Sequence, residues 1–218
     1  MPEPVTLIGL GGGALAIVGH LARLYFDAAK AVLDVVLGLL LAVLLLPVLG
    51  LCAAIIRLSS RGPVFFVQTR VGRGGQCFKM VKLRTMYTDA EQSSGAVWAT
   101  PQDPRVLPAC RWMRRSHVDE LPQLWNVIRG EMSLVGPRPE RPEILAELER
   151  VFPDIRKRLA VRPGITGLAQ IRAGYDTTIE NVRHKLQADL EYIEKRKWGL
   201  ELGILARTVW KLNDKQAR

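Results

Sequence analysis

Two adjacent carboxylates, Asp119 and Glu120, are the residues of this sequence whose types and spacing best fit chemistry on a charged substrate. They precede a short segment with helical character and lie between basic residues that include Arg114 and Arg138. Neighbouring carboxylates oppose each other's ionisation, so the pair is costly unless a cation or a phosphorylated ligand is bound nearby. A structural alternative is that both are first-turn acids, which the helix dipole favours.

The composition indicates one domain that works on anionic partners. The 218 residues suffice for a domain with a real core, and the formal net charge is +10. This charge suits anionic lipids, phosphorylated substrates or nucleic acid. Aromatic residues make up only 6% of the chain, and no basic run is interleaved with them. We therefore expect no nucleic-acid partner.

An apolar run from Val35 to Ile56 is the clearest structural signal. About 20 such residues can cross a bilayer as a helix. However, Pro47 interrupts the run and removes a backbone hydrogen bond. Basic residues also flank both ends, at Lys30 and Arg57, whereas a spanning helix is usually biased to one side. We expect a re-entrant helix within residues 26–60, broken at Pro47; a spanning helix or a buried soluble helix is the alternative.

The rest of the chain predicts an α/β domain that is predominantly helical with a small β-sheet. Residues 1–25 are apolar and glycine-rich and form a separate N-terminal segment in this interpretation, and residues 61–218 form the domain. Short strands are expected at 64–67 and 77–83, around a glycine-rich turn, and a third at 168–171.

Two helices are predicted at the C-terminal end, over residues 178–197 and 200–212. The second is amphipathic, and Trp198, Trp210 and Arg207 lie in or next to it. Aromatic and basic side chains on an amphipathic helix are typical of a helix at a membrane surface. We therefore expect interfacial helices at this end of the domain.

Five motifs in order resemble the monotopic phosphoglycosyl transferase, or bacterial sugar transferase, family, and the resemblance extends from about Lys30 to Val209. Each motif alone is weak, and the five together at this spacing are specific. They are GPVFFVQTRVG (62–72), KLRTM (82–86), DELPQLWNV (119–127), GEMSLVGPRP (130–139) and RPGITGLAQ (162–170).

The resemblance implies an enzyme on the cytoplasmic face of the bacterial inner membrane, in contact with phospholipids. It implies transfer of a sugar 1-phosphate from a nucleotide sugar, by family default a UDP-sugar, to a polyprenyl phosphate, by default undecaprenyl phosphate. The expected cofactor is Mg2+, and UMP is the expected leaving product. Such a reaction is the first membrane step of glycan assembly, for example of an exopolysaccharide. A homodimer and a monomer both remain open.

The resemblance also makes the acidic pair catalytic. Asp119 is the expected nucleophile, because a carboxylate that attacks phosphorus divides one transfer into two steps. Glu120 is expected to hold Mg2+, which prefers hard oxygen ligands, and to help activate the acceptor. Basic side chains would grip the diphosphate and the nucleotide. The expected substrate-binding residues are Lys82, Arg84, Arg114, Arg138, Pro139, Gln170 and Arg172.

The chain departs from the family pattern at a few positions that leave the expected reaction intact. They are Ala31, Leu83, His117, Lys197 and Glu201, the last standing where an Asp is common. An alternative function is a non-catalytic, membrane-anchored scaffold of a glycan assembly complex. A scaffold would keep the anchor and the fold, but it would not need the Asp119–Glu120 pair.

Overall fold

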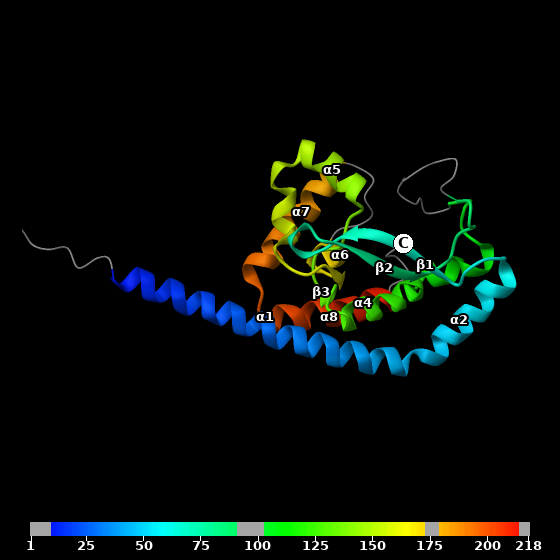
Figure 1. Cartoon of the computed structure of the whole chain (residues 1–218), viewed down its shortest axis with the longest axis horizontal. Helices are drawn as coiled ribbons and strands as arrows, with labels where there is room; N and C mark the ends of the chain where they lie inside the picture. Colours follow the sequence, from blue (N-terminus) through cyan, green and yellow to red (C-terminus); the bar gives the residue numbers. More distant parts are fainter. Residues whose placement is uncertain (1–9, 91–102, 173–178, 214–218) are drawn as a thin grey trace, which may run out of the picture.

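A long, bent pair of helices carries the rest of the chain (Figure 1). The computed structural model describes residues 10–90, 103–172 and 179–213. Helix α1 (Leu10–Leu44) and helix α2 (Leu46–Ser59) meet at a bend of 59°. Pro47 lacks the N–H that would bond to the carbonyl of Val43, and the helix breaks just before it. The break expected at Pro47 is therefore confirmed, although α1 runs without interruption through residues 25 and 26.

The outer side of the helix pair is apolar and exposed. Within the described residues, neither helix alone has the length and composition to cross a membrane, whereas the bent pair passes that test jointly. Large apolar side chains lie on the surface on both sides of the bend, including Leu40 at 61% exposure, Leu44 at 72% and Leu46 at 60%. An exposed apolar surface of this extent is typical of a contact with lipid or with another protein.

Two small sheets lie beside the helices. Strands β1 (Phe65–Val71) and β2 (Cys77–Leu83) form an antiparallel hairpin around the 3-10 turn η1 (Arg73–Gly75). Gly74 and Gly75 both have positive φ there, which glycine adopts without strain. Strands β3 (Ser133–Val135) and β4 (Gly164–Thr166) pair in parallel. The predicted hairpin is confirmed, but the strand expected at 168–171 is wrong, because those residues begin a helix.

The remaining described elements are helical, so the structure is mostly helical with a small amount of sheet, as expected. The 3-10 helices are η2 (Pro108–Cys110), η3 (Val118–Gln123) and η4 (Pro153–Ala160). The α-helices are α3 (Arg111–Arg115), α4 (Leu124–Ile128), α5 (Pro142–Val151), α6 (Leu168–Arg172), α7 (Ile179–Lys195) and α8 (Trp198–Asn213).

Three glycines let the backbones of the β3 and β4 regions approach closely. A Cβ atom on Gly136 would lie 2.5 Å from the carbonyl oxygen of Arg162. Cβ atoms on Gly164 and Gly167 would lie 2.1 and 2.2 Å from backbone atoms of Gly136. These distances leave no room for a side chain, which explains the glycines of two sequence motifs in physical terms.

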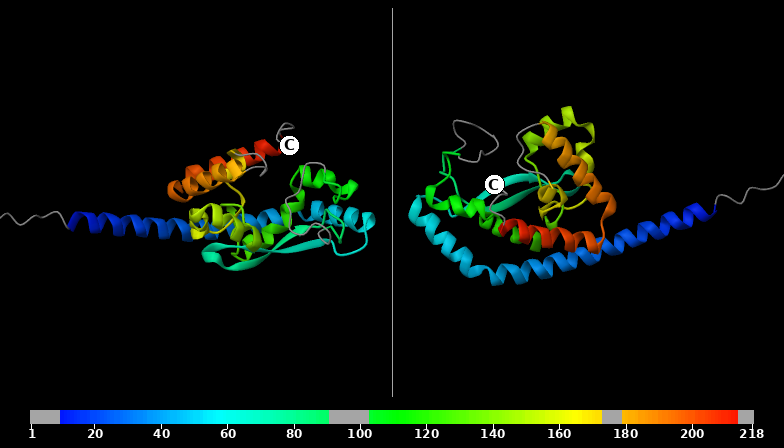
Figure 2. Two further views of the ribbon diagram at one scale, coloured as in Figure 1. Left: turned by 90° about the horizontal axis from the view of Figure 1, so that it is seen from above. Right: turned by 180° about the vertical axis from the view of Figure 1, so that it is seen from behind.

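A buried polar cluster joins α1 to the domain. The amine of Lys30 lies 2.7 Å from Glu201 on α8 and 3.3 Å from Asp34. The hydroxyl of Ser133 donates to Asp34 at 2.6 Å, and the Tyr192 hydroxyl lies 2.7 Å from Glu201. Buried polar groups are stable only when they form hydrogen bonds or ion pairs with one another. These contacts therefore fix the position of α1 relative to β3, α7 and α8. Figure 2 shows α1 extending beyond the rest of the described chain on its N-terminal side.

Candidate active site

The acidic pair lies on η3, in a turn shaped by the residues on each side of it. His117, just before η3, has a φ of 56°, a left-handed conformation that redirects the chain. Asp119 and Glu120 follow, and each is only 8% exposed. On the far side, the amide of Asn126 accepts from the N–H of Val81 at 3.1 Å and donates to the carbonyl of Lys79 at 2.8 Å. These two bonds fix the pair against strand β2.

Glu120 is held by two cationic side chains from separate elements. The Lys82 amine, on β2, lies 2.8 Å from Oε1 of Glu120. The Arg138 guanidinium, in the loop after β3, donates to Oε1 at 2.6 Å and to Oε2 at 3.2 Å. Bidentate, charge-assisted bonds of this kind are strong and geometrically specific. The structure thus brings together Lys82, Glu120 and Arg138, three of the residues predicted from the sequence.

These contacts determine the charge of Glu120. Burial acts to raise the pKa of Glu120, but the positive charges of Arg138 and Lys82 outweigh it and hold that pKa well below its usual value. Burial lowers the pKa of Lys82, and Glu120 opposes that effect. Glu120 is therefore a carboxylate at neutral pH whose oxygens are already engaged.

Asp119 differs from its neighbour. Within the described parts of the chain, its carboxylate has no hydrogen-bond or ion-pair partner within bonding distance. Burial, together with the nearby charge of Glu120, raises the pKa of Asp119 to about 6. An ionised carboxylate that is desolvated and unpaired is suited to nucleophilic attack. The pair thus consists of one carboxylate that is held by two cations and one that has no partner in the described residues.

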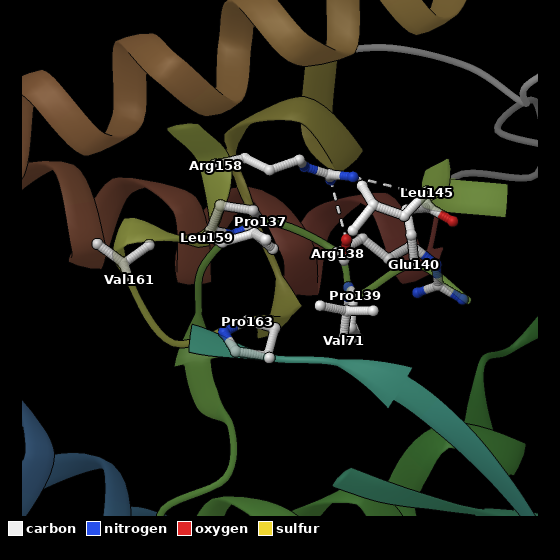
Figure 3. Close-up of a pocket in the computed structure, with 11 residues that line it drawn as sticks. Val71, Pro137, Arg138, Pro139, Glu140, Leu145, Arg158, Leu159, Val161 and Pro163 are labelled. Atoms are coloured by element: carbon white, nitrogen blue, oxygen red, sulfur yellow. Dashed lines mark hydrogen bonds and ion pairs between the residues drawn. The ribbon is translucent and has the colours of Figure 1, made fainter. Parts of the chain in front are cut away.

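Two arginines that sequence reasoning missed hold the loop that carries Arg138. Arg158 donates to the carbonyl of Arg138 at 2.9 Å and to Asp189 at 2.7 Å, and Arg70 donates to the carbonyl of Pro139 at 3.0 Å. Figure 3 shows Arg158 reaching this loop from the side away from β1. The cavity beside the loop measures about 10 Å3, room for roughly one water molecule and not for a substrate. Arg70 lies within the motif at 62–72, but the partners of both arginines are distant in the sequence, so no local pattern reveals this role.

Replacement of Arg158 by Ala is expected to destabilise the protein by about 3 to 5 kcal/mol, since it leaves Asp189, which is 1% exposed, without its partner. The double variant Arg158→Met/Asp189→Leu removes the buried charge and should recover part of this loss. Its catalytic activity should remain low, because Arg138 has lost one of its anchors. Thermal unfolding and nucleotide release would measure the two effects separately. Full activity in the double variant would refute the positioning role of Arg158.

Two other predicted residues lie close to the pair. Arg114, which is half-buried, donates to the Thr85 hydroxyl at 3.3 Å, and its charge lowers the pKa of Asp119. Pro139 is buried next to Arg138, where its carbonyl receives the bond from Arg70. Their contacts with substrate stay predictions.

The structure places the remaining three predicted residues in other surroundings. Arg84 is 4% exposed, and its guanidinium donates to the carbonyls of residues 60, 61 and 63, which fastens the end of α2 to β2. Gln170 donates to the carbonyl of Ile165 at 2.8 Å. Arg172 is exposed and forms an ion pair with Glu191. These contacts support structural roles for Arg84, Gln170 and Arg172, and their binding of substrate stays a prediction.

A magnesium ion fits this donor set only in part. The two adjacent carboxylates supply hard oxygen atoms. The raised pKa of Asp119 means that its ionised form is destabilised, and a nearby cation would stabilise that form. Both oxygens of Glu120, however, already accept from Lys82 and Arg138. No group of three or more metal-ligating side chains occurs in the described residues. A cation here would therefore depend on phosphate oxygens of the substrate for most of its ligands.

Known proteins are similar in sequence to this chain over most of its length. A family model described as bacterial sugar transferase matches residues 25–215. A UDP-glucose:undecaprenyl-phosphate glucose-1-phosphate transferase of Caulobacter vibrioides is 44% identical over 193 residues, which cover 88% of this chain and 72% of that protein.

Two longer relatives differ in the sugar that their names give. An undecaprenyl-phosphate glucose phosphotransferase of Komagataeibacter xylinus is 44% identical over 80% of this chain and 34% of its own length. A UDP-N-acetylgalactosamine-undecaprenyl-phosphate N-acetylgalactosaminephosphotransferase of Aeromonas hydrophila is 37% identical over 83% of this chain and 42% of its own length. The chain thus spans less than half of these two proteins. The acidic pair and its two cationic partners lie within the matched residues. Because the family model matches from α1 to the end of α8, the chain belongs to the bacterial sugar transferase family.

Proposed function

We propose that the chain transfers a sugar 1-phosphate from a UDP-sugar to undecaprenyl phosphate and releases UMP. The observation that carries this proposal is the division of the acidic pair: Glu120 is engaged by Lys82 and Arg138, while Asp119 is buried and unpaired within the described residues. The names of the relatives support the same reaction class. A scaffold would have no need of an unpaired carboxylate in a buried site.

The reaction proceeds in two displacements at one phosphorus atom. A carboxylate oxygen of Asp119 attacks the β-phosphorus of the UDP-sugar, the bond from that phosphorus to the bridging oxygen breaks, and UMP leaves with the electron pair. The product is an acyl phosphate that carries the sugar. A phosphate oxygen of undecaprenyl phosphate then attacks the same phosphorus and returns the carboxylate of Asp119. Lys82 and Arg138, both beside Glu120, are placed to stabilise phosphate charge as it develops.

Mg2+ is proposed as the cofactor, with Glu120 among its ligands and phosphate oxygens of the substrate supplying most of the others. It would neutralise negative charge on the diphosphate as UMP leaves. Removal of divalent cations with EDTA is expected to abolish turnover, and Mg2+ should restore it. Undiminished turnover after exhaustive chelation would contradict this part of the proposal.

The bent pair α1–α2 is proposed to be re-entrant, with both ends at the cytoplasmic face of the inner membrane. The exposed apolar residues around the bend support this placement, because lipid is a favourable contact for them. Helix α8 would lie at the same surface, since Trp210 is 79% exposed and Leu202 is 63% exposed while Glu201 and Ile204 face the core. An acidic pair fixed at this level can meet both a water-soluble donor and a lipid acceptor.

A nucleotide-release assay tests the proposed reaction. The full chain in detergent would receive a panel of nucleotide sugars with undecaprenyl phosphate, and UMP release is the expected result. Release of UDP would indicate ordinary glycosyl transfer, and no release with any donor would favour the scaffold. A UDP-sugar labelled at the β-phosphate should leave label on the wild-type protein but not on Asp119→Asn. Label that persists on Asp119→Asn would refute the covalent role of Asp119.

A further inference from the structure

A second charged cavity lies between α1 and the corner where α7 passes into α8. Its volume is about 200 Å3, and its walls include Arg23 and Phe26 of α1 and Arg196, Lys197 and Trp198 of the corner. We propose that this cavity binds the phosphate headgroup of an anionic membrane phospholipid. The proposal rests on the placement of α1 at the membrane surface, and not on the transfer reaction.

The charges of the cavity leave a positive excess. Arg196 is committed, since it donates to Asp27 at 2.6 Å and to the carbonyl of Ile193 at 3.2 Å. Arg23 and Lys197 have no carboxylate partner in the described parts of the chain. Glu194 also lines the cavity. With Asp27 included, three cations face two carboxylates, and the single positive charge that remains matches a phosphodiester, which carries one negative charge.

The rim of the cavity has the composition of a membrane interface. Phe26 and Trp198 pack with ring centroids 5.0 Å apart. On the same stretch of α1, Leu21, Leu24 and Tyr25 are exposed, with Tyr25 at 76%. Aromatic rings gather at headgroup depth, and basic pockets between helices at the cytoplasmic surface bind lipid headgroups. Acyl chains of a bound lipid would lie along the apolar face of α1.

The proposed transfer reaction does not account for this cavity. In Figures 1 and 2 the α7–α8 corner meets the N-terminal half of α1, whereas α4, which follows the acidic pair, lies farther toward α2. The cavity is also smaller than the roughly 300 to 1,000 Å3 that sites for whole small-molecule ligands occupy, which fits a headgroup and not a nucleotide sugar. Undecaprenyl phosphate, a monoester, carries more negative charge than the cavity's excess of one positive charge.

Lipid titration of the full chain, delipidated in detergent and followed by native mass spectrometry, tests the proposal without use of catalytic activity. The wild-type protein should bind phosphatidylglycerol more tightly than phosphatidylcholine. Arg23→Ala/Lys197→Ala should bind phosphatidylglycerol roughly 30-fold more weakly, since two basic residues are lost. Both side chains are exposed and without carboxylate partners in the described residues, so this variant should fold normally.

The control variant Arg150→Ala/Arg183→Ala removes the same charge from exposed positions on α5 and α7, and it should keep wild-type lipid binding. Equal losses in the two variants would mean that net charge alone attracts the lipid, and the proposal would fail. It would also fail if phosphatidylglycerol bound to the Arg23→Ala/Lys197→Ala variant as it does to wild type, or if undecaprenyl phosphate displaced the lipid from this site. UMP release measured in parallel keeps a failure of this site distinct from a failure of the proposed enzyme.

Discussion

Replacement of Asp119 by Asn is expected to abolish transfer and to stabilise the folded protein at neutral pH. The folded-state pKa of Asp119, about 6, lies above the ordinary aspartate value of 3.8. The folded protein therefore binds the carboxyl proton of Asp119 more tightly than the unfolded protein does. As pH rises from about 4 to about 6, ionisation of Asp119 lowers the stability of the folded protein progressively. Above pH 6 the expected gain from Asn is about 2 kcal/mol, or an increase in Tm of about 4 to 8 °C. Near pH 4 the gain should disappear.

The neighbouring substitution Glu120→Gln is the matched control, and its effect on stability should have the opposite sign. The folded-state pKa of Glu120 is depressed, so its charge stabilises the fold above the unfolded pKa, and this contribution is lost as pH falls through the folded pKa. The Gln variant leaves Lys82 and Arg138 without their carboxylate partner. Thermal unfolding in EDTA between pH 4 and 8 would compare the two variants. A lower Tm for Asp119→Asn at pH 8 would refute the account of an unpaired, destabilised nucleophile.

The parts of this structure that follow local rules were accessible from the sequence. The apolar run with Pro47 predicted a broken helix, and the glycine-rich turn between 64–67 and 77–83 predicted the β1–β2 hairpin. The family motifs brought Lys82, Arg138 and the acidic pair onto one list of candidates, and the structure brings them together. Hydrophobic periodicity, turn chemistry and helix breakers act over a few residues, so one sequence suffices to show them.

Contacts between distant residues were not accessible in this way. Lys30 and Glu201 are 171 positions apart, and Arg138 and Arg158 are joined through a backbone carbonyl that carries no sequence signal. Arg84 was among the expected substrate-binding residues, but its guanidinium donates to backbone carbonyls at and after the end of α2. The segment 168–172 contains Leu, Ala, Gln and Arg, all good helix formers, and this local preference prevails just after the short strand β4.

Replacement of Arg138 by Lys is expected to reduce the rate of UMP release by about a hundredfold, the usual effect of losing one preorganised donor at a reacting centre. Lys keeps the positive charge but lacks the planar fork that reaches both Oε1 and Oε2 of Glu120. Stability should fall less than activity, because the Arg138 side chain is 43% exposed and Lys82 still pairs with Glu120. Initial rates at saturating donor and acceptor would measure the effect on kcat.

Arg129→Lys is the matched control for Arg138→Lys. Arg129 is also an exposed arginine that pairs with a glutamate, Glu131, at 3.4 Å, but it does not contact the acidic pair. Its replacement should leave both UMP release and Tm near wild-type values, since exposed ion pairs contribute little. If Arg138→Lys retained full activity, the positive charge alone would be sufficient at this position. The bidentate contact with Glu120 would then be a structural feature of the resting site, and a single point charge at this position would be enough to stabilise the phosphate groups.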